Sequence, residues 1–510
     1  MKRRFLSLLA LALTSCLPLA SCKKEASQTE EEGMFYLHVL NAEDYIDESL
    51  LDTFHELYPN CTVIYETYDT NETMYNELQT GKANYDLVCC SEYMVQRLAS
   101  ERLIRPIEGL VTYEENVSDF LTNDDPSNPG MIDTIEVYDK YSGEDLGKLS
   151  SFAKGYMWGT LGIVYNPEYK TYVERGLEVE NIVSRLNSDD GWSEFWNADF
   201  KGTQSIKDSM RDTYALGIFE VFKDKFLDPT ISHEDKSKLY FNNHSPETIE
   251  LVKNKLIELK SNIFGFEVDG GKNDIVTGKI GMNLAWSGDA CFSILQGDYY
   301  PGEDESYEEE KPEGARTDIY FALPTIGSNI WFDAWCMPQT VQKDSVNEKY
   351  AKLFLDFLSE PENVIANMSY SGYTSFMSGN GEAEENEILA YILDSYDAEE
   401  VEEGMVEYDI TYFFNGASNV VLNVDESSWE GRTLKAQYPE ASDLDRLYVM
   451  EDFGSDNSKI VKMWEDVKVN PLPTFVVVVL LSVIVLTFGY LGSYKLIKAY
   501  KVKKRKSYRQ

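Results

Sequence analysis

The residues best suited to chemistry in this chain are a tryptophan and an aspartate two positions apart, Trp331 and Asp333. They stand in the apolar run Asn329–Met337, which predicts a strand, and residues two apart on a regular strand share a face. An aromatic ring attracts a cation by about 0.5–2 kcal/mol, and a buried carboxylate is costly unless something cationic meets it. The pair therefore predicts a cation site. The alternative is a structural ion pair of Asp333 with Arg211 or with a lysine from elsewhere.

Enzymatic chemistry has little support in the sequence. No histidine stands in a metal-ligand spacing, and the chain has neither a Gly-x-Ser-x-Gly nucleophile motif nor a glycine-rich phosphate loop. Paired acids are expected by chance among 88 acidic residues, and a glycosidase needs two facing carboxylates, which a sequence does not show. We expect a protein that is not an enzyme and that holds no metal or cofactor. The histidines are His38, His55, His233 and His244.

Residues 63–98 contain elements that could position a binding site. Val63–Tyr68 alternates β-branched and aromatic residues, which predicts a strand, and a helix follows from the Asp69–Asn71 cap to Gly81. Tyr85–Cys90 is a short apolar run typical of a strand buried on both faces of a parallel sheet. Ser91 and Tyr93 come directly after it. Open α/β sheets bind ligands at the carboxyl ends of their strands, so these two residues are site candidates.

The same stretch resembles the spermidine/putrescine-binding proteins of bacterial ABC importers. In that family a strand ending in Thr-Tyr-Asp-Thr-Asn-Glu-Thr-Met and a strand leading into Ser-x-Tyr-x-Val recur, and the similarity covers most of residues 35–467. The resemblance implies an α/β fold of two lobes, as in type II periplasmic binding proteins, with a ligand cleft between the lobes. It also implies that the chain captures spermidine or putrescine and delivers it to an ABC permease. The ATPase would be a separate chain, because no ATP-binding motif is present here.

A polyamine carries ammonium groups at intervals along a methylene chain. Carboxylates can replace the water around each charge, and rings can cover the methylenes. The resemblance implies such a groove, position by position. The implied ligand-binding residues are Tyr45, Ser91, Tyr93, Asp208, Asp212, Trp286, Asp289, Trp331, Asp333 and Tyr373, with Glu43 adding an acid nearby.

Several of these residues could have a structural role in place of ligand binding. Trp286 and Trp331 could be core residues, because tryptophan is usually well buried. Asp208 and Ser91 could each cap the helix that follows. Two positions also depart from the family: Ala42 stands where tryptophan is usual, and Met450 where some members have glutamine. The wall of rings is therefore expected to be thinner on one side.

The chain order predicts lobes that are each built from two separate segments. We expect lobe 1 over 34–162 and 329–380, and lobe 2 over 163–328 and 381–468. Linkers are expected at 23–33 and 469–473. Two low-complexity segments, 112–150 and the acid-rich 301–316, are expected to be loops, and Trp192–Gly202 a surface helix and turn.

Both ends of the chain predict contact with a membrane. Residues 1–22 form a basic, apolar and small-residue series typical of an export signal, and Leu-Ala-Ser-Cys resembles a lipobox with Cys22 as the lipidated residue. The alternative is an ordinary cleaved signal. Residues 474–494 predict a transmembrane helix, and the basic tail 495–510 is expected in the cytoplasm by the positive-inside rule. The alternative is a buried core helix. The body is expected outside the cytoplasm, in the periplasm or at the cell surface.

The net charge of −42 repels nucleic acid and favours cations, although solubility alone could explain it. Five cysteines of the body show no metal-ligand spacing, so no disulfide scaffold is expected, while a single bridge stays open. They are Cys61, Cys89, Cys90, Cys291 and Cys336. The alternative functions are a receptor or sensor for another small solute and, from a different class, a surface glycosidase or adhesin.

Overall fold

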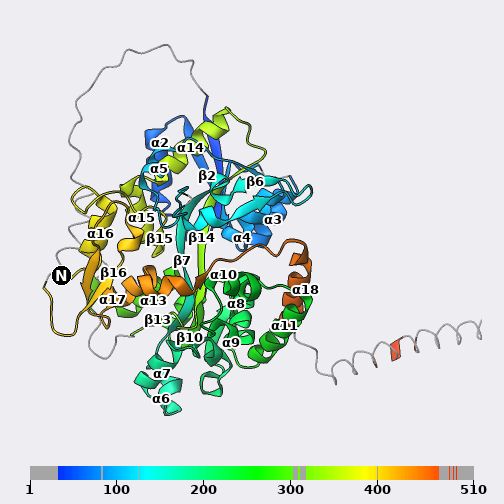
Figure 1. The fold of residues 1–510 in the computed structure, drawn as a ribbon, viewed down its shortest axis with the longest axis vertical. Helices are drawn as coiled ribbons and strands as arrows, with labels where there is room; N and C mark the ends of the chain where they lie inside the picture. The colour runs from blue at the N-terminus through cyan, green and yellow to red at the C-terminus, as the bar shows by residue number, and fades with distance from the viewer. Residues whose placement is uncertain are drawn as a thin grey trace, which may run out of the picture.

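The structure, a computed structural model, describes residues 33–469 apart from 82–83, 126, 302–307, 311–317 and 399, together with residues 482, 486, 487 and 490. Two α/β lobes lie one above the other in Figure 1, and two long strands run between them. These strands are β7 (Ala153–Tyr165) and β14 (Ser328–Pro338). The expected two-lobe α/β architecture is confirmed.

Lobe 1 is built on a sheet whose strands follow the order β2-β1-β3-β14-β7. The first three strands are parallel, and β14 is antiparallel to β3 and to β7. The strand–helix–strand–helix order expected for residues 63–98 is confirmed, with Thr70 as the cap that accepts a hydrogen bond from the Thr73 amide. The elements of lobe 1 include β1 (Phe35–Ala42), β2 (Cys61–Tyr68), β3 (Leu87–Ser91), α2 (Ser49–Leu57), α3 (Asn71–Gln79), α4 (Glu92–Ser100), α14 (Val346–Leu358), α15 (Pro361–Ser371) and β15 (Thr374–Ser375).

Lobe 2 continues the path as β7-β10-β8-β9, with β13 on β7. Because β8 is parallel to both β9 and β10, the carboxyl ends of these strands lie at one edge, which faces lobe 1. Helices cover the sheet, and α18 lies against α11 at the right of Figure 1. The main elements are β8 (Gln204–Lys207), β9 (Gly265–Glu267), β10 (Met282–Trp286), β13 (Tyr320–Ala322), α8 (Met210–Val221), α11 (Pro246–Lys260), α12 (Gly271–Val276), α13 (Ser287–Asp298), α17 (Trp429–Gln437) and α18 (Asn457–Lys468).

Strand β7 belongs to both lobes. It pairs with β14 up to Thr160 and with β10 from Leu161 onward, so the lobe boundary expected after residue 162 falls within this strand. All but one of its thirteen residues are buried. Within the segment 381–468, α17 and α18 pack on helices of lobe 2, whereas α16 (Glu387–Tyr396) contacts both α15 and α17.

Two expected surface segments have more structure than the sequence indicates. The expected loop 112–150 contains most of α5 (Val111–Asn116) and a hairpin of β5 (Glu136–Tyr138) with β6 (Asp145–Lys148). In the acidic segment 301–316, the described residues include a short strand that pairs with the strand before it. The sequence did not predict these short strands, because the alternation of polar and apolar residues in a strand cannot be recognised over only three or four residues.

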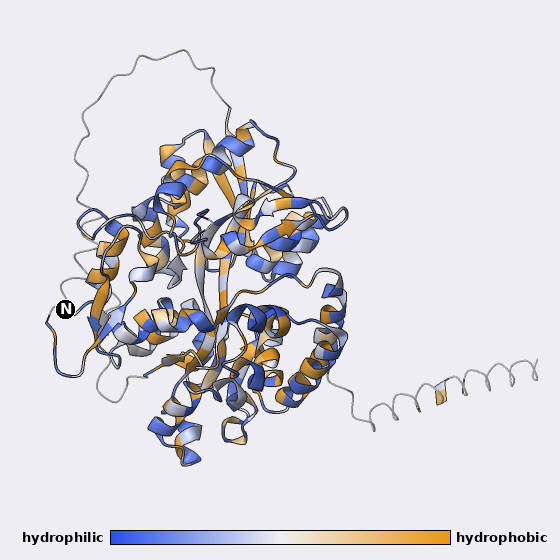
Figure 2. Cartoon of the chain, in the orientation of Figure 1, coloured by the Kyte–Doolittle hydropathy of each residue, from blue (hydrophilic) through white to orange (hydrophobic). Residues whose placement is uncertain are grey.

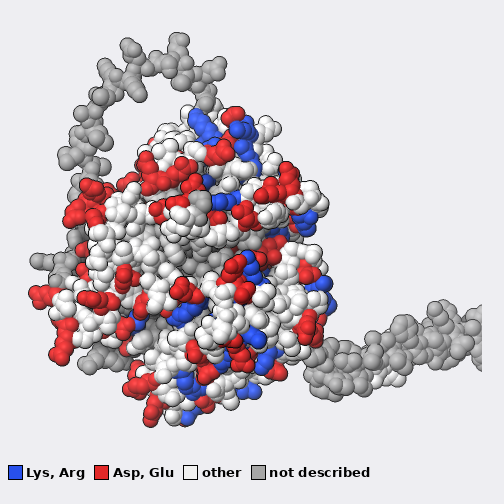
Figure 3. Space-filling view, in the orientation of Figure 1, with Lys and Arg blue, Asp and Glu red and all other residues white. Residues whose placement is uncertain are grey.

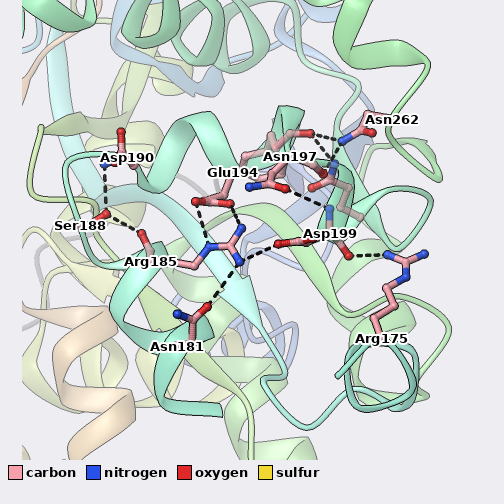
Figure 4. A network of polar contacts seen from close by, with 11 residues as sticks. Arg175, Asn181, Arg185, Ser188, Asp190, Glu194, Asn197, Asp199 and Asn262 are labelled. Carbon is pink, nitrogen blue, oxygen red and sulfur yellow. Dashed lines mark hydrogen bonds and ion pairs between the residues drawn. The ribbon is translucent and has the colours of Figure 1, made fainter. Parts of the chain in front are cut away.

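The expected surface helix at Trp192–Gly202 is wrong. Short 3-10 turns run through this segment, and they bury Trp192, Phe195 and Phe200 in the core of lobe 2. Figure 4 shows the polar network beside them. The Arg185 guanidinium donates to both carboxylate oxygens of Glu194, and it donates a hydrogen bond of 2.9 Å to Asp199. Alternating rings and acids look amphipathic in sequence, but Glu194 is buried against Arg185, and only Asp199 keeps an exposed side chain.

Hydrophobic residues concentrate along the central strands and on the inner faces of the helices (Figure 2). On the face drawn in Figure 3, acidic side chains spread over both lobes. The cysteines at 61, 89, 90, 291 and 336 are buried and free.

The export signal at 1–22 with Cys22, the helix at 474–494 and the tail at 495–510 lie outside the described residues, apart from four isolated positions. Among the residues that are described, no helix is both long and apolar enough to cross a bilayer.

Candidate functional site

The candidate site is a cavity of about 160 Å³ between the two lobes. A single water needs roughly 10–15 Å³ on this measure, so the cavity suits a small solute. The residues come from strand ends in both lobes, as open α/β sheets require. All eleven predicted ligand residues line it: Glu43, Tyr45, Ser91, Tyr93, Asp208, Asp212, Trp286, Asp289, Trp331, Asp333 and Tyr373. Their placement together is observed, and their binding of a ligand stays a prediction.

Three rings form one wall of the cavity. Tyr373 meets the ring of Tyr45 edge-on at 5.1 Å and that of Trp331 at 5.6 Å, measured between ring centroids. Tyr373 follows Gly372, which ends α15 in the left-handed conformation with φ 75°. A Cβ at Gly288 would lie 2.3 Å from this tyrosine ring, so the close approach requires glycine there.

Asp333 stands beside these rings at the lobe 1 side of the cavity. It lies opposite Ser91 on β3, and the Tyr45 hydroxyl donates a hydrogen bond of 2.7 Å to its Oδ2. Burial raises the pKa of Asp333, while hydrogen bonds from Ser91 and Tyr45 act in the opposite direction. Among the described residues, no lysine or arginine forms an ion pair with it. The described residues therefore do not show the alternative, a structural ion pair of Asp333 with an arginine or a lysine.

Sequence reasoning missed further acids of the cavity, among them Glu72 and Glu92. Glu92 is 1% exposed, and burial, with Asp333 next in effect, raises its pKa well above the usual range. Burial also raises the pKa of Glu72 and of Asp212. Glu92 lies between Ser91 and Tyr93, but a glutamate in the first helical turn is so common that the pattern alone did not mark it.

Asp289 is already paired inside lobe 2. Its Oδ2 lies 2.7 Å from the Nζ of Lys207, and its Oδ1 accepts a hydrogen bond of 3.0 Å from the Tyr373 hydroxyl. Lys207 is 0% exposed, its Nζ lies 3.1 Å from Glu267, and it sits 4.2 Å from the centre of the Trp286 ring. Burial alone would lower the pKa of Lys207, but Asp289 and Glu267 raise it overall.

Two ion pairs lie toward the rim of the cavity. Asp208 accepts from Lys468 of α18 at 2.7 Å, and Ser209, not Asp208, caps α8. Lys272 of lobe 2 lies 2.9 Å from Asp269 and 3.7 Å from Asp44 of lobe 1. The second contact joins the lobes, but Asp44 is 66% exposed at its side chain, and such exposed pairs contribute little.

Ser91 occupies the cap position of α4 but makes no side-chain cap bond, and instead accepts from the Asn71 amide at 3.0 Å. Tyr93 lies across the cleft from Arg211 of lobe 2, whose guanidinium is 5.1 Å from the tyrosine ring and 3.8 Å from Phe453. Arg211 is 4% exposed, and its Nε and Nη1 have no hydrogen-bond partner among the described residues. Arg211, which the sequence analysis gave as an alternative partner of Asp333, therefore packs on the rings of Tyr93 and Phe453.

Ala42 and Met450, the two positions that depart from the family pattern, both line the cavity. A thinner wall of rings was expected there. Tyr68 lines it too, and its strand position pairs directly with Ala42 in the parallel register of β1 and β2. Its hydroxyl donates to the Cys89 carbonyl at 2.9 Å. A ring from the neighbouring strand therefore lies next to the alanine.

The cavity combines rings with buried carboxylates, so it can replace the water around an organic cation. No group of three or more His, Cys, Asp or Glu side chains suited to a metal occurs in the part of the chain that is described. Rings and buried carboxylates are groups that suit ammonium groups and the methylenes between them.

Comparison with known proteins gives one family. Residues 49–387 match the family described as bacterial extracellular solute-binding protein. The spermidine/putrescine-binding periplasmic protein of Escherichia coli is 23% identical over 340 residues, which cover 66% of this chain and 76% of that protein. The putrescine-binding periplasmic protein SpuD of Pseudomonas aeruginosa is 24% identical over 75% of this chain and 86% of its own length.

Solved structures share the fold. The spermidine/putrescine ABC transporter substrate-binding protein PotD of Streptococcus pneumoniae superposes with a TM-score of 0.51 at 23% identity. That superposition covers 85% of this chain and 98% of the pneumococcal one.

Proposed function

This chain belongs to the bacterial extracellular solute-binding proteins, and from that premise we propose that it captures a polyamine, spermidine or putrescine, between its lobes. Relatives named for polyamine binding support this ligand class. We further propose delivery to an ABC permease with a separate ATPase, which the name of the pneumococcal ABC transporter substrate-binding protein supports. Proteins of this family bind solutes, and we propose no catalytic step here.

One observation carries the proposal: Asp333 is a carboxylate with raised pKa, held by the Tyr45 hydroxyl beside three rings, and it has no cation among the described residues. A buried carboxylate that has no cation beside it is stabilised when an ammonium group binds to it. Rings attract the same group and cover the methylenes next to it.

The test is a ligand panel with the purified full-length chain. Thermal stability should rise with a diamine or a triamine and not with maltose or glutamate, because a ligand that binds only the folded state adds about 2.7 kcal/mol at a hundredfold excess over its Kd. A clear shift with maltose or glutamate, and none with any polyamine, would replace this function by a receptor for another solute. Hydrolysis of a glycoside would favour the glycosidase alternative.

We propose that the body works outside the cytoplasm, held at the membrane by lipid on Cys22 and by a helix at 474–494. The sequence patterns at the two ends support this placement, and relatives named as periplasmic proteins support an extracytoplasmic body.

A further inference from the structure

The lobe 2 end of the cavity already contains an ammonium group, the Nζ of Lys207. Its surroundings are those that a bound amine would need: a carboxylate oxygen of Asp289 at 2.7 Å, one of Glu267 at 3.1 Å, and the face of Trp286 at 4.2 Å. The Val268 carbonyl accepts a further hydrogen bond of 3.1 Å. The lysine is fully buried and lines the cavity.

Seven of the acids that line the cavity fall into two groups, while Glu43, Asp44 and Asp69 line it as well. Those of the first group have protein cations: Asp289 has Lys207, Asp208 has Lys468, and Asp269 has Lys272. Those of the second group form no ion pair with any described residue and have raised pKa values: Glu72, Glu92, Asp212 and Asp333. Three of the second group come from lobe 1, where Tyr45, Trp331 and Tyr373 also stand.

We propose that Lys207 is a resident ammonium that fills the cation position of lobe 2, so that the cleft selects a short diamine over a triamine. This inference rests on the proposed function and adds the length and charge of the ligand. Asp212 is the one acid of the second group that lobe 2 contributes, so this lobe can take one ammonium of the ligand. A further ammonium at Trp286 would stand against the like charge of Lys207, because Asp289 and Glu267 already pair with that lysine. The third amine of a triamine thus gains nothing at this end.

The first measurement uses the wild-type full-length chain and titration calorimetry with putrescine and spermidine. We expect putrescine to bind at least as tightly as spermidine, because the acids beside Lys207, Asp289 and Glu267, are already paired and offer nothing to a third ammonium. Spermidine binding tighter than putrescine, beyond the error of the titration, would overturn the proposal even if no variant can be made.

The second measurement changes the lysine. Lys207→Met keeps much of the stem and removes the charge, which leaves Asp289 free for a ligand amine. The ratio of spermidine to putrescine affinity should rise by about tenfold or more, and spermidine should raise the melting temperature of the variant more than that of wild type. An unchanged ratio in a folded variant would overturn the proposal.

The matched control is Lys272→Met, which removes another lysine of the same cavity whose partners are largely exposed. If loss of any positive charge sufficed, both variants would shift the ratio equally, and the proposal would fall. Should Lys207→Met not fold, Lys207→Met combined with Asp289→Asn removes the orphaned charge and should keep the wild-type ratio. A chain that binds neither amine in any form would instead contradict the proposed function itself.

Discussion

Single side chains decide how this cleft treats a cation. Asp333 could be predicted from the sequence, because a carboxylate inside an apolar strand is rare and calls for a partner. Glu92 and Lys207 could not, since their meaning depends on which group lies opposite in space. Lysine is almost never fully buried unless paired, but the pairing of Lys207 with Asp289 joins residues 82 positions apart.

Asp333→Asn keeps the shape of the side chain and removes its charge. Polyamine affinity should fall by about thirtyfold to several-thousandfold, which corresponds to about 2–5 kcal/mol for a buried charged contact. The ligand-free variant should be no less stable than wild type, because the uncompensated charge is gone. Calorimetric titration and melting of the ligand-free protein measure both effects. Unchanged affinity with a large loss of stability would mean that Asp333 has a structural role instead.

Glu92→Gln should change how stability depends on pH. The folded-state pKa of Glu92 is raised, so the folded protein holds this proton more tightly than the unfolded chain does. Its contribution to stability therefore falls as pH rises from about 4.3, the unfolded value, through the raised folded value. Urea unfolding at pH 5 and pH 8 should show a smaller decline for Glu92→Gln than for wild type. Glu180→Gln, on an exposed helix position, should behave as wild type; equal declines in all three would contradict the assignment.

Helices and strands place these side chains, and glycines set how closely they approach. Elements with strong periodicity, such as those of residues 63–98, could be predicted with their order. Elements of three or four residues, such as β5 and β6, could not, because so short a run carries no period. The Trp192–Gly202 segment failed for another reason: Glu194 is buried against Arg185, and sequence spacing does not show such an internal pair.

Gly288→Ala should displace the Tyr373 ring. The added Cβ would come within 2.3 Å of it, so the contacts of Tyr373 with Asp289 and Tyr45 would weaken. Forced overpacking of this kind costs about 1–3 kcal/mol, and ligand affinity should fall as well. Chemical unfolding and titration of the variant test this. Gly265→Ala is the control, because open space surrounds that position; equal effects at both glycines would show that the ring is not involved.

The whole molecule is two lobes around two shared strands, and this arrangement was expected from the family resemblance and not from composition or periodicity. Alternation of strands and helices indicates an α/β fold but does not say that β7 changes partners midway. Long-range pairing of β14 with both β3 and β7 depends on contacts across more than a hundred residues, which local patterns do not encode.

The two ends of the chain give a prediction about attachment. Cys22→Ala should abolish lipid labelling yet leave the protein in the membrane fraction, because the apolar segment 474–494 would, as a helix, be long enough to span the hydrocarbon core. Removing the residues after Lys468 as well should release the protein. Labelling with a radioactive fatty acid and ultracentrifugation follow each step. If the doubly changed chain still sediments with membranes, another anchor exists.

The weak contact of Lys272 with Asp44 has a kinetic consequence. This pair joins the lobes at an exposed rim, so dissolved salt screens it, and it adds little to the lifetime of the closed state. Other contacts also join the lobes, among them the buried ion pair of Arg97 with Asp452 and the hydrogen bond of Tyr373 with Asp289. A rise in ionic strength should therefore change the escape rate of a solute that bridges lobe 1 and lobe 2 only slightly through this pair.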